Sequence, residues 1–143
     1  MIEGKTFDSH FVESLIPQKF PFVMVSQLID YSETTLISGF TVKSDNIFFL
    51  NGYLQESGMI EHMAQSVALH TGYQFYLRQE VAPAGYIGSI KDLNIVSLPK
   101  LNDVVVTSVN IIQEFGGITL VSISTKLNGE EIASGQMKTV LAV

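Results

Sequence analysis

One stretch of the chain, residues 57–77, constrains the fold more than any other. It reads SGMIEHMAQSVALHTGYQFYL, and as a helix it would carry apolar side chains around most of its circumference. A helix that is apolar on nearly every side is normally buried on nearly every side. At about 1.5 Å per residue such a helix would be roughly 30 Å long, about the width of a small domain. We therefore predict one long, buried, central helix.

Two polar residues interrupt this apolar surface. Glu61 and Gln65 lie one helical turn apart, so they share a face of the helix. A carboxyl group in apolar surroundings is a candidate acid or base. A glutamate near the start of a helix is also favoured by the helix dipole, without any catalytic role. Gln65 equally fits a structural role as a buried hydrogen-bonding residue. The residues alone leave these interpretations open.

Segments with β-strand character lie on both sides of this helix. A short helix around residues 11–16, with Asp8 or Ser9 as its N-cap, comes first. The predicted strands are residues 22–31 and 35–43 before the long helix, and 86–96, 104–113, 118–127 and 132–143 after it. Gly116-Gly117 and Asn128-Gly129 are typical of tight hairpin turns between the later strands.

This order of elements predicts the fold class. Strands that are grouped together, rather than alternating with helices, indicate an α+β fold with an antiparallel sheet. Because the helix is apolar on almost every side, we expect the sheet to curl around it. No repeat, linker or low-complexity segment divides the chain, so we predict a single domain over residues 1–143.

Composition excludes several classes of function. A formal net charge of −6 leaves no basic stripe for nucleic acid. Cysteine is absent, and His62 and His70 are too far apart to bind one metal ion as neighbours on a helix, so we predict no metal site and no cofactor. The sequence has no signal segment and no apolar run long enough for a membrane span, which predicts a cytoplasmic protein that does not bind membranes.

Short motifs follow one another along nearly the whole chain. They are LIP at 15–17 followed by PFVMV at 21–25, DNIFF at 45–49, EHMAQ at 61–65, and the segment from Gly88 to Asp103 with Leu98-Pro99 in its turn. In this order they resemble the 3-hydroxyacyl-ACP dehydratases of the hot-dog fold. The DN-x-FF and E-x-MAQ elements are similar to a divergent branch, the dehydratase-like proteins of aryl-polyene pathways. The resemblance implies an antiparallel sheet of about five to six strands wrapped around one long central helix.

The resemblance also implies a catalytic site. Enzymes of this family pair a histidine in a loop with a carboxylic acid on the central helix, and two subunits of a dimer supply them. Glu61 matches the acid and Gln65 the glutamine beside it, so both are predicted catalytic residues. The histidine has no match, because Gly52 occupies its position when the loop is aligned from Phe48-Phe49. Residues predicted to bind substrate are Tyr53, Ser57, Gly58 and Gly88.

The leading hypothesis is a dehydratase-like protein that acts on a 3-hydroxyacyl-ACP or 3-hydroxyacyl-CoA thioester in fatty-acid, polyketide or aryl-polyene synthesis. Glu61 would be its acid or base. The missing histidine motivates an alternative, a non-catalytic acyl-binding or scaffolding subunit of an active dehydratase. A weaker alternative is a hot-dog acyl thioesterase in which Glu61 activates water. The resemblance implies a homodimer, or a heterodimer with another hot-dog protein.

Overall fold

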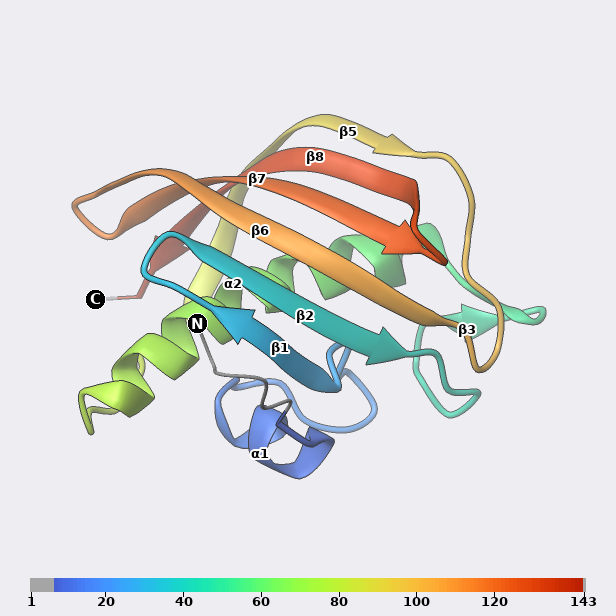
Figure 1. The fold of residues 1–143 in the computed structure, drawn as a ribbon, viewed down its shortest axis with the longest axis horizontal. Helices are drawn as coiled ribbons and strands as arrows, with labels where there is room; N and C mark the ends of the chain where they lie inside the picture. Colours follow the sequence, from blue (N-terminus) through green and yellow to red (C-terminus); the bar gives the residue numbers. More distant parts are fainter. Residues whose placement is uncertain (1–6, 143) are drawn as a thin grey trace.

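A computed structural model describes residues 7–142, in which a six-stranded antiparallel sheet curves over one long helix (Figure 1). The elements in chain order are α1 (Ser9–Ser14), β1 (Gln27–Tyr31), β2 (Thr35–Thr41), β3 (Phe49–Leu50), β4 (Tyr53–Leu54), α2 (Glu56–Leu77), β5 (Gly85–Ile95), β6 (Val104–Phe115), β7 (Ile118–Leu127) and β8 (Glu130–Leu141). The strand order across the sheet is β1-β2-β6-β7-β8-β5. The predicted α+β architecture with a central helix is confirmed.

Helix α2 fills the concave side of the sheet. Met59, Met63 and Leu69 are completely buried. On β7, Val121, Ile123 and Thr125 are buried, while the residues between them are partly exposed. This period of two places one face of the strand toward the helix. No helix of the described residues is both long enough and apolar enough to cross a membrane.

Three tight turns carry glycine in a left-handed backbone conformation. Gly116-Gly117 and Asn128-Gly129 form the predicted hairpin turns, with φ of 61° and 80° in the first and 52° and 84° in the second. A third turn, Asn51-Gly52, was not predicted. It joins β3 to β4, and its φ values are 54° and 86°. It has the same Asn-Gly signature of a type I′ turn as the predicted one.

The first predicted strand, residues 22–31, was too long. β1 begins only at Gln27, because side chains of α2 bind the preceding backbone. The Met24 N–H donates to Gln65 Oε1 at 2.7 Å, and the Met24 carbonyl lies 2.6 Å from His62 Nδ1. Backbone groups already satisfied by side chains do not need a neighbouring strand. This irregular segment packs against the same part of α2 that carries Glu61.

Candidate active site

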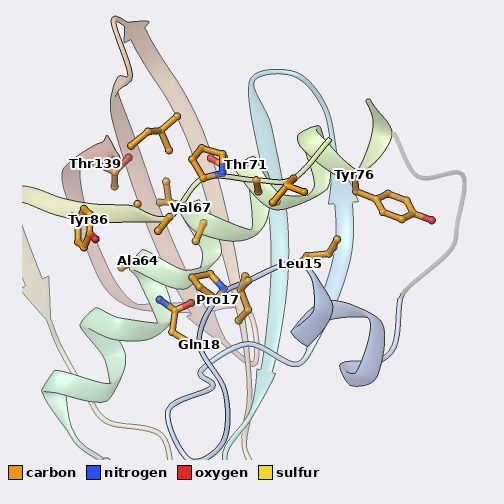
Figure 2. A pocket seen from close by; sticks show the side chains of 18 of the residues that line it. Leu15, Pro17, Gln18, Ala64, Val67, Thr71, Tyr76, Tyr86 and Thr139 are labelled. Carbon is orange, nitrogen blue, oxygen red and sulfur yellow. The ribbon is translucent and has the colours of Figure 1, made fainter. Parts of the chain in front are cut away.

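A groove of about 860 Å³ runs along one face of α2 (Figure 2). Small and apolar side chains of the helix, including Ala64, Val67 and Ala68, form its floor. One wall is the segment 14–18, and the other comes from residues 80–87 and the end of β8. Figure 2 shows Pro17 and Gln18 on one side of Ala64, with Tyr86 and Thr139 on the other side of the helix.

Glu61 is half-buried and lines this groove. It is the sixth residue of α2, and the acidic residue in the first turn is Glu56. The helix dipole acts mainly within the first turn. The interpretation of Glu61 as a residue that only stabilises the helix start is therefore wrong.

Gln65 fixes the orientation of the Glu61 carboxyl group. Its Nε2 donates to Glu61 Oε2 at 2.6 Å and to the Phe22 carbonyl at 2.8 Å, while its Oε1 accepts from the Met24 N–H. The Gln65 side chain is only 1% exposed, and its amide has a partner on both the oxygen and the nitrogen. Because Oε2 of Glu61 accepts a hydrogen bond, a protonated Glu61 carries its proton on Oε1.

No imidazole of the described residues lines the groove. His62 is fully buried, with Nδ1 near the Met24 carbonyl and Nε2 2.7 Å from Thr107 Oγ1. Burial lowers the pKa of His62 to about 4. His70 is also buried, its Nε2 lies 2.9 Å from the Ser32 carbonyl, and burial lowers its pKa. His10 is exposed on α1.

The position that the family resemblance assigns to the missing histidine is the tip of the β3–β4 hairpin. Gly52 lies there with a φ of 86°, and no other group lies within 4 Å of where its Cβ would be. A residue with a side chain would be strained in this conformation. Gly52 therefore offers no side chain in place of the histidine.

The four predicted substrate-binding residues are not among the described residues that line the groove. Tyr53 lies on the β3–β4 hairpin and is 41% exposed. Ser57 is exposed in the first turn of α2, one helical turn before Glu61. A Cβ on Gly58 would approach Leu54 Cδ1 to 2.6 Å, so close packing is sufficient reason for glycine there.

Gly88 lies on β5 beside the groove. The pairing of β5 with β8 shifts between Ile87 and Ser89, which makes Gly88 the extra residue of a β-bulge. Its neighbours Tyr86 and Ile87 line the groove. Of the six predicted site residues, the structure thus brings Glu61 and Gln65 into direct contact, and the other four are not among the described residues that line the groove. Sequence reasoning missed the groove wall at 14–18, whose LIP motif was used only for the family resemblance.

Comparison with known proteins gives consistent matches over the whole described chain. The family model for ApeP-like proteins, described as ApeP dehydratase, matches residues 10–142. A 3-hydroxyacyl-[acyl-carrier-protein] dehydratase, FabZ, from Vibrio cholerae is 25% identical over an alignment of 142 residues, and the match covers 95% of this chain and 92% of the relative.

Solved structures share the fold. The dehydratase heterocomplex ApeI:P from Xenorhabdus doucetiae matches with a TM-score of 0.86 and 20% identity, over 92% of this chain and 91% of that chain. A hypothetical thioesterase protein with coenzyme A from Streptococcus pneumoniae matches with a TM-score of 0.63 and 10% identity, over 93% of each chain. At these identities the likeness concerns the fold alone, and it confirms the predicted hot-dog fold.

Proposed function

Because the chain belongs to the ApeP-like dehydratase family, we propose that it is a subunit of a 3-hydroxyacyl thioester dehydratase in which Glu61 protonates the leaving hydroxyl group. The observation that carries this proposal is the Glu61 carboxyl group, held by Gln65 at the side of an apolar groove. In the reaction a base takes a proton from the α-carbon, and the bond from the β-carbon to its hydroxyl oxygen breaks. Glu61 gives the proton on Oε1 to that oxygen, so an enoyl thioester and water are formed.

The groove fits the acyl chain of such a substrate. Small and apolar residues of α2 line it from Glu61 to Tyr76, roughly 22 Å along the helix axis at about 1.5 Å per residue. None of the described lining residues is Lys, Arg or His, so no cation there would attract a charged ligand instead. We propose that acyl-ACP is the substrate, the class named for the Vibrio relative.

The base has to come from elsewhere, since no imidazole of the described residues faces the groove. We propose that a second hot-dog subunit supplies it by pairing along β5. This strand is at the end of the sheet, and among the described residues it pairs only with β8. Its exposed apolar residues include Tyr86 and Ile90, and a long, unpaired apolar edge is a common site for strand pairing with another chain. One of the similar structures is a dehydratase heterocomplex, which supports the proposal of a second subunit but not the strand along which it pairs.

The test compares wild-type protein with Glu61→Gln in the formation of enoyl-ACP from a 3-hydroxyacyl-ACP. Each is assayed alone and with a hot-dog partner that contains the loop histidine. Loss of a general acid lowers the rate by roughly 10²–10⁴. Glu130→Gln is the matched control, because Glu130 is an exposed carboxylate at the start of β8 and is not among the described residues that line the groove. Full activity of Glu61→Gln would remove Glu61 from the mechanism.

A second candidate function is a non-catalytic subunit that stabilises an active dehydratase, and the glycine at position 52 favours it. In that case Glu61→Gln leaves the activity of the mixed complex unchanged, whereas omission of this chain lowers it. Release of free thiol from the acyl thioester would instead indicate the thioesterase predicted as a weaker alternative. A cytoplasmic location is part of the proposal and can be tested by fractionation.

A further inference from the structure

Five hydrogen-bond contacts link the sheet to Glu61, and all but the last are buried. Thr125 Oγ1 on β7 lies 2.6 Å from Thr107 Oγ1 on β6, which lies 2.7 Å from His62 Nε2. His62 Nδ1 lies 2.6 Å from the Met24 carbonyl. The Met24 N–H donates to Gln65, whose Nε2 donates to Glu61, at 2.7 and 2.6 Å.

The chemistry of these groups fixes the direction of each bond. A carbonyl only accepts, so His62 Nδ1 carries the proton that faces Met24. The ring is neutral in its buried position, so Nε2 is an acceptor and the Thr107 hydroxyl donates to it. The Thr107 oxygen then accepts from Thr125. One tautomer of His62 therefore satisfies every member of the chain of hydrogen bonds.

Met24 is held at both of its backbone polar groups. His62 binds its carbonyl and Gln65 binds its N–H, in a segment that belongs to no strand or helix. Without the bond from His62, a buried carbonyl loses its donor, and the segment has to move to satisfy it. Movement of Met24 takes away the donor that fixes Gln65 Oε1, and the Gln65 amide is then free to turn away from Glu61.

We propose that His62 is a positioning residue for Glu61, which holds the Met24 backbone so that Gln65 presents its amide to the Glu61 carboxyl group. His62 is not among the described residues that line the groove, so it acts only through its neighbours. The proposal rests on the proposed function in so far as it concerns catalysis.

Two substitutions at this position separate positioning from general stability. In His62→Asn the amide nitrogen takes the place of Nδ1 and still donates to Met24, but the contact with Thr107 is lost. In His62→Gln the amide reaches the place of Nε2 and Thr107, but the donor to Met24 is lost. Both variants remove the imidazole from the same buried site, so a purely stabilising role would affect them alike.

In His62→Gln we expect kcat of the complex with its partner to fall by about ten- to a hundredfold, while KM changes less than about twofold. Misplacement of a catalytic group by about 1 Å has effects of this size on kcat. His62→Asn should keep kcat within about threefold of wild type on the same reasoning. Equal losses in the two variants would overturn the proposal.

Nuclear magnetic resonance of the wild-type complex tests the positioning without any activity. The imidazole ¹⁵N shifts should report the Nδ1–H tautomer of His62, and the Met24 amide should exchange slowly although it lies outside the sheet. In His62→Gln the Gln65 side-chain amide protons should exchange faster than in His62→Asn. An Nε2–H tautomer, or a Met24 amide that exchanges as an exposed loop does, would overturn the proposal. A wild-type complex that forms no enoyl product but passes these tests refutes the proposed function alone.

Discussion

Helix α2 carries polar side chains in two rows that are satisfied in different ways. His62, Ser66 and His70 follow one another at intervals of one turn and bind groups of β6, β2 and the β1–β2 turn. All three are buried. Glu61 and Gln65 form the second row, on the side of the groove and the segment 22–24.

The comparison separates structural polar groups from a chemically available one. In the first row each side chain has at least one polar atom within hydrogen-bond distance of a strand or turn group, as expected where water is excluded. In the second row Gln65 uses its amide to hold Glu61 Oε2, and no described residue makes a hydrogen bond to Oε1. A carboxyl group with one fixed and one free oxygen can hold or release a proton at a defined place.

The largest effect is expected from His62 in the row that faces the sheet, and it is a loss of folding stability in acid. The pKa of His62 is lowered by burial to about 4, against 6.5 in the unfolded chain, so the unfolded chain binds the proton first. The free energy of unfolding should therefore fall as the pH drops from about 6.5 to about 4, by roughly 3 kcal/mol from this residue. Urea unfolding over this pH range measures it.

His62→Asn is the control for this prediction, because it removes the titrating group. Its free energy of unfolding should depend less on pH than that of the wild type. The slopes of the two proteins should differ by about 1.4 kcal/mol per pH unit within the same range. Burial also lowers the pKa of His70, which should add to the slope in both proteins. Identical slopes would mean that His62 accepts a proton in the folded protein as easily as in the unfolded one.

The side of α2 that lines the groove should not tolerate added volume where it packs most closely against the groove wall. A Cβ on Gly72 would lie 2.0 Å from the Leu15 carbonyl oxygen, where the groove wall crosses the helix. Gly72→Ala should lower the free energy of unfolding by about 1–3 kcal/mol, because the wall has to move. Thermal and urea unfolding measure the loss. Gly85→Ala is the control, because Gly85 also lines the groove and the nearest atoms to its Cβ position are 3.7 Å away.

A smaller effect is expected for Ser66 and its partner across the core. Ser66 Oγ donates to the His62 carbonyl and lies 2.7 Å from Ser38 Oγ on β2. Ser66→Ala leaves the buried Ser38 hydroxyl without its acceptor and should cost about 1 kcal/mol. In the double variant with Ser38→Ala no orphaned hydroxyl remains, so the loss should be less than the sum of the single losses. Additive losses would mean that the two hydroxyls do not interact.

Local patterns in the sequence predicted most of the fold, because helix and strand periods and Asn-Gly turns act over a few residues. The apolar circumference of 57–77 predicted α2 to within one residue at its start. Residues 22–26 were wrongly predicted as strand, since backbone groups of Phe22 and Met24 bind side chains about forty positions later, on Gln65 and His62. Such long-range contacts leave no mark in local sequence.

The candidate site was predicted in part for the same reason. Glu61 and Gln65 are neighbours on one helix, so their contact follows from helical spacing. The role of His62 could not be predicted, because it depends on which strand residues face the helix. Thr107 is a polar residue, so nothing in its sequence position indicated that it would be buried against His62. The walls of the groove join segments from both ends of the chain, which only the folded protein brings together.

The smallest expected effect on stability belongs to Glu61→Gln, and it completes the comparison of the two rows. The substituted amide keeps an oxygen that can accept from Gln65, and the side chain is half-buried rather than enclosed. The free energy of unfolding should change by less than about 0.5 kcal/mol. A loss of about 2 kcal/mol or more in urea unfolding would give Glu61 a structural role like that of the sheet-facing row. A stable Glu61→Gln variant that no longer forms enoyl thioester, beside a Glu130→Gln variant that still does, would instead show that the two faces of α2 separate chemistry from structure.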